Sequence, residues 1–222
     1  DPKNHRKRLL ATRNATPGRS YYGEGLVSAN FGGKITEFRF WDPFRSKLSA
    51  CILKGLKTMP FKEGVSCLYL GASTGTTPSH ISDLLGEGGK LFAVEVAPRV
   101  AREFLENVSR FRKNIVPIIA DARHPERYGS VYGEISLIYC DIAQPDQTEI
   151  AIKNCERYFG KDKEGMLFLV VKASSINALQ NKNIVFEEQT RKLKEANFDI
   201  LEEIDLEPYD RNHEIIVSKS QV

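Results

Sequence analysis

The stretch Cys67-Leu-Tyr-Leu-Gly-Ala-Ser-Thr-Gly-Thr-Thr77 determines how the rest of the chain is interpreted. It begins with apolar, strand-forming residues, continues through Gly71 and Gly75, and ends in two threonines. This order predicts a buried strand, a tight turn and the start of a helix. The glycines have no Cβ and would let backbone N–H groups approach a ligand, while Thr76 or Thr77 is expected to cap the helix.

This loop alone is also consistent with a simple tight connection, because it lacks both the three-glycine dinucleotide fingerprint and the Gly-Lys-Ser/Thr end of a phosphate loop. Glu95 adds a second signal, since it ends the strand-like run 90–95, twenty residues after Gly75. In a doubly wound sheet, an acidic residue at this place accepts hydrogen bonds from a ribose diol. The alternative is a solvated Glu at a strand end, and its distance from the glycine loop favours the ribose interpretation.

The composition is that of an ordinary soluble domain, with 222 residues of which 41% are hydrophobic and 27% charged. The four cysteines are scattered without a C-x-x-C pair, at Cys51, Cys67, Cys140 and Cys155. This predicts core cysteines in a reducing compartment, with neither a disulfide framework nor a metal site. The polar N-terminus and the lack of a long apolar run predict a cytoplasmic protein without a signal peptide.

The net charge is only +3, but basic residues are concentrated in two regions of the chain. One is the first twenty residues, with Lys3, Arg6, Lys7, Arg8, Arg13 and Arg19; the other surrounds an expected helix, with Arg99, Arg102, Arg110, Arg112 and Lys113. Clustered Lys and Arg are typical of a nucleic-acid-binding face. Two ordinary solvated surfaces are the alternative.

From residue 65 onward, strand-like and helical patterns alternate, which predicts right-handed βαβ units and a mostly parallel sheet. We expect strands at about 66–71, 90–95, 115–119, 135–140 and 166–172, and helices at about 76–85, 98–109, 146–159 and 185–196. The runs 197–206 and 213–218 flank a turn-rich segment and predict a closing antiparallel hairpin. Residues 1–41 predict a small β appendage, and residues 42–222 the main domain.

Asp42-Pro43 is expected to start a helix, with Asp as the cap and Pro in the first turn. Phe44, Leu48, Cys51, Ile52 and Gly55 follow at helical spacing and predict its apolar stripe. Lys47 lies at the edge of this stripe. Its side chain is expected either to reach water or to work in a cleft.

Ligands of open α/β sheets bind outside the carboxyl ends of the strands. The residues expected at this rim are the 71–77 loop, Glu95-Val96, Asp121-Ala122, the segment 141–144 and Lys172. Asp121 and Asp141 are as compatible with helix capping or loop anchoring as with ligand binding. Lys172 ends a long apolar run, where an adjacent Asp141 would favour its charged form. A lysine held by such a carboxylate can orient or deprotonate a hydroxyl group.

Several motifs resemble those of the fibrillarin family. They are Gly71-Ala-Ser-Thr-Gly-Thr-Thr77, Asp121-Ala-Arg-His-Pro125, Asp141-Ile-Ala-Gln-Pro-Asp-Gln147, Leu206-Glu-Pro-Tyr209, Trp41-Asp-Pro-Phe-Arg-Ser-Lys-Leu48 and Tyr22-Gly-Glu24. The resemblance runs from about Thr12 to the C-terminus and is to the archaeal form, which lacks a Gly/Arg-rich tail. One departure is Ser73-Thr74, where the family often has Ala-Ser; both are small.

This resemblance implies the class I methyltransferase (Rossmann-like) fold, with a seven-stranded sheet. It also implies an S-adenosylmethionine-dependent RNA 2′-O-methyltransferase, guided by C/D box RNA and acting on rRNA, with tRNA as a further target. The implied partners are the guide and target RNAs, a Nop-type coiled-coil scaffold protein and a kink-turn-binding ribosomal-type protein. In a eukaryotic form without its tail, the location would be nucleolar.

The family's Lys-Asp-Lys-His tetrad falls on Lys47, Asp141, Lys172 and His213 by this resemblance. Lys172 is the candidate for steering or accepting the hydroxyl proton. The implied cofactor contacts are Gly71, Ala72, Thr74, Gly75, Thr76, Thr77, Glu95, Val96, Asp121, Ala122, Asp141, Ile142, Ala143 and Gln144.

Two other functions are compatible with parts of the sequence. Gly71-Ala-Ser73-Thr-Gly75 has the form of a G-x-S-x-G nucleophile elbow, which would indicate an α/β hydrolase but would leave Glu95 and Lys172 without a role. A non-catalytic RNA-binding or assembly module would keep the fold without methyl transfer. The presence of all four tetrad residue types argues against it.

Overall fold

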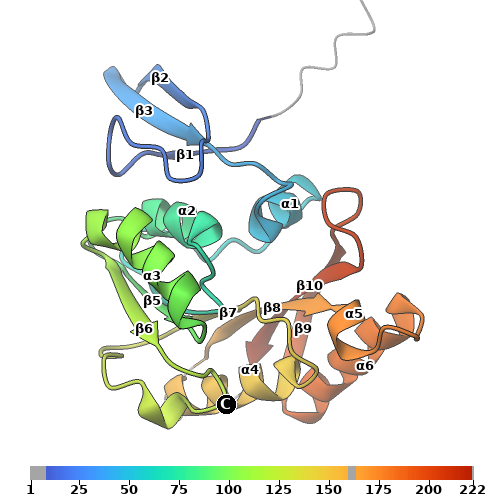
Figure 1. Ribbon diagram of the computed structural model, residues 1–222. Coiled ribbons are helices and arrows are strands. Elements are labelled where there is room, and N and C mark those ends of the chain that lie inside the picture. The colour runs from blue at the N-terminus through green and yellow to red at the C-terminus, as the bar shows by residue number, and fades with distance from the viewer. Residues whose placement is uncertain (1–8, 160–163, 222) are drawn as a thin grey trace, which may run out of the picture.

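A seven-stranded sheet forms the centre of the computed structural model, which describes residues 9–159 and 164–221 (Figure 1). In spatial order the strands are β6 (Ile115–Ile119), β5 (Lys90–Glu95), β4 (Ser66–Leu70), β7 (Leu137–Cys140), β8 (Met166–Lys172), β10 (His213–Ser220) and β9 (Phe198–Asp205). The first five run parallel, whereas β10 is antiparallel to both of its neighbours. The predicted parallel sheet and C-terminal hairpin are confirmed.

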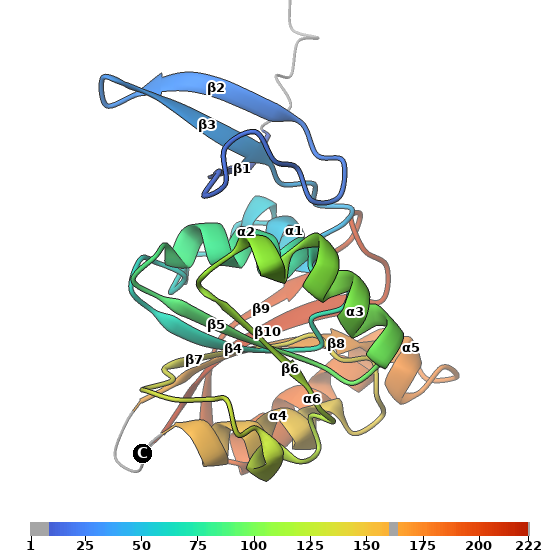
Figure 2. The same cartoon turned by 60° about the vertical axis from the view of Figure 1, so that its left-hand side comes forward.

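Two helical layers cover the sheet (Figure 2). One face carries α1 (Lys47–Leu53), α2 (Thr76–Leu85) and α3 (Pro98–Asn107), and the other carries α4 (Gln147–Tyr158) and α6 (Lys182–Glu195), with the short α5 (Ala173–Ile176) beside α6. Because both faces are buried, the parallel strands are continuous apolar runs. Along β4, Leu68 and Leu70 pack into one core cluster, and Cys67 and Tyr69 into the other.

The start of α1 differs from the sequence prediction. The helix begins at Lys47 with Ser46 as its N-cap, and not at Asp42. Asp42 instead accepts a hydrogen bond from the backbone N–H of Phe44 at 2.9 Å, which closes a turn of the kind that competes with helix. Phe44 is therefore outside the helix and exposed, although Leu48 and Cys51 of the predicted stripe are buried.

The predicted threonine cap of α2 is also wrong. The N-cap is Gly75, which has a left-handed φ of 97° and no side chain to donate or accept. The hydroxyl of Thr77 points inward and shares a hydrogen bond of 2.9 Å with Ser46 on the segment before α1. Thr77 therefore ties α2 to α1.

The N-terminal sheet consists of β1 (Ala11–Arg13), β3 (Lys34–Phe40) and β2 (Leu26–Phe31), antiparallel and in that order. Strand β1 packs against α2 (Figures 1 and 2). The fully buried Arg39 fixes this contact, since its guanidinium pairs with Glu24 and with Asp83 of α2. The β character predicted for this segment is confirmed, whereas its division from the main domain at residues 41 and 42 stays a prediction.

All four cysteines have free thiols and are buried. The core location that the apolar contexts of three of them predicted is confirmed. Burial raises the pKa of the Cys51 thiol to about 12 and those of the other three still further, so these side chains behave as small core groups. None of the helices within the described ranges has both the length and the hydropathy of a membrane span.

Candidate active site

The glycine loop between β4 and α2 depends on two close backbone approaches. Gly71 has a φ of 87°, and a Cβ there would lie 2.3 Å from the carbonyl oxygen of Asp141. Gly75 has a φ of 97°, and its Cβ would lie 2.5 Å from the ring of Phe104 on α3. Both positions require glycine because protein segments pack closely against them, whereas the sequence pattern indicated the approach of a ligand.

The carboxylate of Glu95 is held at the end of β5 by two backbone donors. The N–H of Ser73 donates to one carboxylate oxygen at 2.8 Å, and the N–H of Ala97 donates to the other at 2.9 Å. Each carboxylate oxygen can accept more than one hydrogen bond. Glu95 is therefore fixed in orientation beside the loop and keeps acceptor capacity for a diol.

A cleft of about 220 Å³, open to solvent, lies along the carboxyl ends of β4, β5, β6 and β7. Nine of the residues predicted to bind cofactor line it: Gly71, Glu95, Val96, Asp121, Ala122, Asp141, Ile142, Ala143 and Gln144. The other five, Ala72, Thr74, Gly75, Thr76 and Thr77, are not among its lining residues. Ala72, Gly75 and Thr77 are buried, with Gly75 against Phe104 of α3, whereas Thr74 is exposed.

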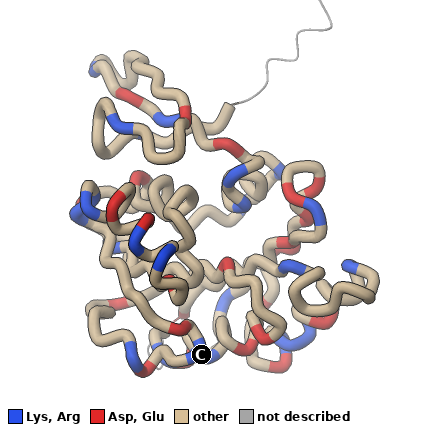
Figure 3. Tube along the Cα trace, in the orientation of Figure 1, with Lys and Arg blue, Asp and Glu red and all other residues tan. Residues whose placement is uncertain are grey.

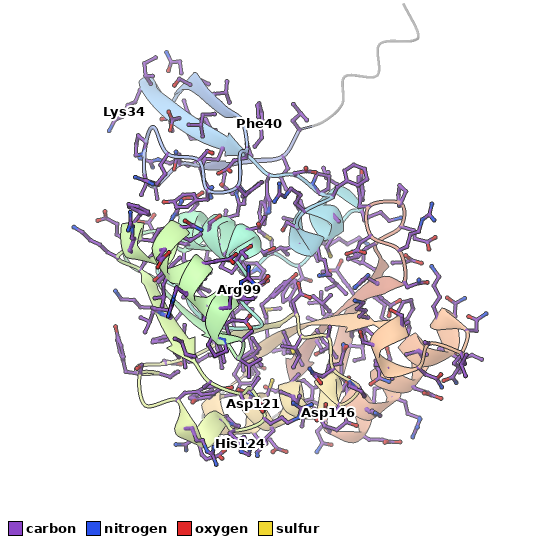
Figure 4. All side chains as sticks on the ribbon, viewed as in Figure 1. Lys34, Phe40, Arg99, Asp121, His124 and Asp146 are labelled. Atoms are coloured by element: carbon purple, nitrogen blue, oxygen red, sulfur yellow. The ribbon has the colours of Figure 1, made fainter. Side chains whose placement is uncertain are left out.

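Arg123 lines this cleft and was not predicted to do so, although it lies within the quoted Asp121–Pro125 motif. Its guanidinium forms an ion pair with Asp146 at 2.7 Å and donates to the side-chain oxygen of Gln144 at 3.1 Å. Asp121 lies 3.8 Å from the same guanidinium. Figure 4 shows Asp121 and Asp146 at this rim. Arg123 thus joins the loop after β6 to the loop after β7, and Asp146 balances its charge.

Lys47 and Asp141 meet next to the cleft. The Lys47 Nζ lies 3.0 Å from each carboxylate oxygen of Asp141. Burial acts to lower the pKa of Lys47, but the neighbouring Asp141 charge and hydrogen bond outweigh it, so the net shift is upward and the ammonium form is stabilised. The sequence pattern favoured Lys172 as the neighbour of Asp141; the ion-pair partner is Lys47 instead.

Lys172 and His213 are direct cross-strand partners in the antiparallel pair of β8 and β10. Directly opposed residues extend from the same face of a sheet, so these side chains are neighbours. His213 is buried, and its Nδ1 lies 2.8 Å from the carboxylate of Asp210. All four tetrad residues are therefore gathered at the carboxyl ends of β7 and β8, together with an Asp210 that sequence reasoning missed.

The hydrolase alternative lacks the geometry that it needs. Ser73 does have a left-handed φ of 50°, as a nucleophile elbow would. The described histidines are engaged elsewhere: His80 contacts Thr12 and Tyr22, His124 contacts Glu126, and His213 contacts Asp210. In the described ranges, no hydrogen bond joins Ser73 to a histidine base, and the side chains offer no group of three or more metal-ligating residues.

The fibrillarin family model matches residues 2–222. The chain belongs to the fibrillarin family. Among curated relatives, the fibrillarin-like rRNA/tRNA 2′-O-methyltransferase of Pyrobaculum aerophilum is 48% identical over 213 residues, covering 96% of this chain and 88% of the relative. The family resemblance in the sequence is thereby confirmed.

Solved structures of fibrillarins share the fold. Aeropyrum pernix fibrillarin, in complex with natively bound S-adenosyl-L-methionine, matches with a TM-score of 0.82 at 38% identity, covering 95% of this chain and 88% of that chain. The fibrillarin of a fibrillarin/Nop5p complex matches with a TM-score of 0.75 at 36% identity, covering 86% and 90%. The predicted class I methyltransferase fold is confirmed, and the expected enzyme class and cofactor agree with the descriptions of these relatives.

Proposed function

We propose that this chain is a guide-directed RNA 2′-O-methyltransferase that uses S-adenosylmethionine and forms the catalytic subunit of a C/D box ribonucleoprotein. The observation that carries the proposal is the position of the tetrad. Lys47, Asp141, Lys172 and His213 converge beside a carboxylate-lined cleft at the end of the parallel sheet. Binding cleft and proton-handling groups are thus adjacent.

The cleft fits this cofactor by its chemistry. Glu95 would hold the ribose hydroxyls, and Asp121 the polar edge of the adenine, with Val96 and Ala122 as apolar surfaces beside the ring. A sulfonium group is a cation, and the cleft presents Glu95, Asp121 and Asp141, while its one arginine is balanced by Asp146. Because Lys47 balances the charge of Asp141, the excess negative charge of the cleft comes from Glu95 and Asp121, and it favours binding of a cationic cofactor. By the family resemblance, the methionine end would lie near Asp141.

When bound, S-adenosylmethionine supplies an activated methyl group on a positively charged sulfur. The residues of the chain must then align a ribose 2′-hydroxyl and manage its proton as the carbon–oxygen bond forms. Alignment of reacting groups supplies about 7–11 kcal/mol in well-oriented reactions. Lys172 and His213 are placed to orient the hydroxyl group or to receive its proton. The Lys47–Asp141 ion pair lies beside them.

The solved fibrillarin/Nop5p complex supports a Nop-type partner for this chain. We propose a Nop-type coiled-coil scaffold protein and a kink-turn-binding ribosomal-type protein as partners of this chain. The guide RNA would select the target nucleotide in rRNA or tRNA by base pairing. The protein then needs to recognise the ribose and its phosphate surroundings, without reading the sequence.

The test measures transfer of labelled methyl from S-adenosylmethionine to a C/D-guided RNA, with the two partner proteins added or omitted. We expect transfer only with the complete particle, and none to a target that carries 2′-deoxyribose at the selected position. An assembled particle that binds the cofactor but transfers nothing would contradict the proposal and favour a non-catalytic assembly module.

A matched pair of variants assigns the proton-handling role. Lys172→Ala should lower the transfer rate by about 100-fold or more while the affinity for S-adenosylmethionine changes less than about twofold. Lys219→Ala is the control, since Lys219 lies at the opposite end of the same β8–β10 pair and contacts Glu164. Equal rates for both variants would remove Lys172 from the mechanism.

A further inference from the structure

The segment between β9 and β10 carries a carboxylate that contacts the histidine of the tetrad. Asp210 lies in this segment, three residues before His213, and its Oδ1 is 2.8 Å from the histidine Nδ1. The backbone carbonyl oxygen of Arg211 lies 2.8 Å from the same nitrogen. Both neighbours of Nδ1 are therefore oxygen acceptors.

These two acceptors decide which tautomer of His213 the site stabilises. A carboxylate oxygen and a peptide carbonyl can only accept, so the hydrogen bonds form only when Nδ1 carries the proton. In the neutral ring the lone pair then belongs to Nε2. A carboxylate on Nδ1–H fixes both the tautomer and the ring orientation of a histidine, and it stabilises the ring when Nε2 takes up a proton.

The surroundings keep Asp210 ionised for this task. Burial acts to raise the pKa of Asp210, but the His213 hydrogen bond and the nearby charges of His213, Lys47 and Lys172 outweigh it, and the net shift is downward. Asp210 in turn contributes to the raised pKa of Lys47. Two carboxylates, Asp141 and Asp210, thus face the three basic groups of the tetrad.

The segment that carries Asp210 is anchored on both sides by contacts with other parts of the chain. The Tyr209 ring packs edge-on against Phe44 with centroids 5.3 Å apart, and Lys54 of the α1 C-terminus donates to the Glu207 carbonyl at 2.7 Å. Beyond Asp210, the Asn212 carbonyl accepts from the N–H of Ala173, the residue after Lys172. The segment lies beside α1 in Figures 1 and 2. These contacts keep Asp210 close enough to Lys47 and Lys172 for their charges to interact.

We propose that Asp210 is a positioning residue of the methyl-transfer site, which holds His213 as the Nδ1–H tautomer and presents the Nε2 lone pair to the ribose hydroxyl. The role in transfer rests on the proposed function; the tautomer does not. Asp210 acts through His213 and contacts no reacting atom. Asp141 has the corresponding task for Lys47, so each carboxylate orders one basic group.

The first test observes the tautomer directly and needs no activity. Long-range 15N–1H correlation spectra of the complete chain, recorded where His213 is neutral, should show Nδ1 as the protonated nitrogen in the wild type. In Asp210→Ala the resonances should move toward a mixture of tautomers. The matched control is Glu126→Ala, because Glu126 lies 3.1 Å from Nδ1 of His124; it should alter the His124 resonances and leave those of His213 unchanged. Wild-type His213 protonated on Nε2 would overturn the proposal.

The second test measures transfer in the assembled particle. Asp210→Ala should lower kcat by about 10- to 100-fold with the KM for S-adenosylmethionine changed less than about twofold. Asp210→Asn keeps an acceptor but removes the charge, so its loss should be intermediate, and Asp210→Glu should recover part of the rate. Glu126→Ala should transfer at the wild-type rate.

The outcomes separate the two proposals. A wild-type particle without transfer would contradict the proposed function, while the spectra would still decide the tautomer. A wild-type particle with transfer, together with an Asp210→Ala rate within twofold of it, would overturn the positioning role. If Asp210→Ala does not fold, Asp210→Asn decides: a loss of fivefold or more supports the role, and an unchanged rate rejects it.

Discussion

Lys47 and Asp141, 94 residues apart in the chain, form an ion pair in which the ammonium lies 3.0 Å from both carboxylate oxygens. Lys47 is the first residue of α1, and Asp141 directly follows β7. The pair therefore joins a helix of one layer to the rim of the sheet. Because it is partly buried, removal of one member leaves the other charge without compensation.

We expect the two members to act as a unit in methyl transfer. Lys47→Met and Asp141→Asn should each lower the rate by about 100-fold, and the double variant should be little worse than either, which corresponds to a coupling energy of about 2–3 kcal/mol. The measurement is a double-mutant cycle on kcat. The control is Lys182→Met, which breaks the pair of Lys182 with Asp205 at 2.8 Å, away from the cleft. If the rate loss of the double variant equalled the product of the two single losses, the pair would not be coupled.

A second prediction compares two glycines that share a left-handed backbone but differ in surroundings. Gly55 has a φ of 103°, and no atom of the described residues lies within 4 Å of an added Cβ, whereas a Cβ on Gly71 would lie 2.3 Å from the Asp141 carbonyl oxygen. Gly55→Ala should cost about 1–2 kcal/mol of unfolding free energy through backbone strain alone. Gly71→Ala should cost at least about 2 kcal/mol more, because the segments that follow β4 and β7 must move apart to admit the methyl group.

Urea unfolding of both variants measures this difference. Titration with S-adenosylmethionine adds a second readout, since displacement of Asp141 from Gly71 changes the cleft, and only Gly71→Ala should weaken binding. Equal losses of stability in the two variants would show that the close approach between Gly71 and Asp141 is readily relieved.

The sequence predicted the regular elements well where hydrophobic runs are long. The bounds expected for β5, β6, β8 and α2 are those observed, because an apolar run between turn residues leaves a parallel strand little freedom of register. The start of α1 was missed because Asp42 is as good a turn residue as a helix cap, and local sequence does not decide between them.

Side-chain pairings across long sequence separations could not be predicted from local pattern. Arg112 was expected in an exposed basic cluster, but it is buried, with its guanidinium 2.5 Å from Asp83 and a further hydrogen bond to Tyr21. Asp210 lies in a turn without hydrophobic periodicity, so the sequence pattern did not indicate its position next to His213. Residues 1–8, with four of the predicted basic side chains, lie outside the described residues.

Glu214 provides a prediction about stability and pH. Burial and the neighbouring charges of Glu203 and Asp205 raise its pKa to about 7. In the part of the chain that the structure describes, its Oε1 is buried without a hydrogen-bond partner. A raised pKa means that the folded state holds the proton more tightly than the unfolded state. The stabilising contribution is therefore complete below the unfolded value of 4.5 and is lost as the pH rises through about 7.

Glu214→Gln stays neutral and should remove this pH dependence. At pH 8 the variant should be more stable than the wild type by about 1–2 kcal/mol, a figure reduced for the partial exposure of the side chain. The difference should vanish near pH 4.5. Urea unfolding at constant ionic strength measures both, with Glu156→Gln on the exposed surface of α4 as control. A gain in stability that is the same at both pH values would indicate a packing effect.

The last prediction concerns the basic residues around α3. Arg99, Arg102, Arg110 and Lys113 are exposed, and Figure 3 shows the charged residues along this part of the chain. Arg19, from the other predicted basic region, lies over the Phe111 ring at 3.5 Å, and Arg110 lies over the same ring at 4.5 Å. The two basic regions therefore meet at Phe111. We propose that the exposed members bind RNA phosphates, and that Arg112 does not.

Neutralisation of Arg99, Arg102 and Lys113 to Gln should weaken binding of C/D guide RNA and reduce the slope of log affinity against log salt by about 0.7–0.9 for each phosphate that the protein no longer neutralises. Arg112→Gln should instead lower the unfolding free energy by about 3–5 kcal/mol, because it leaves the buried Asp83 with one partner fewer. Neutralisation of Arg157, Arg191 and Lys194, on the opposite helical layer, is the matched control. Fluorescence anisotropy between low and moderate salt measures the slopes. If the α3 triple variant kept the wild-type slope, its cations would be ordinary solvated side chains, and RNA binding would have to come from another face of the protein.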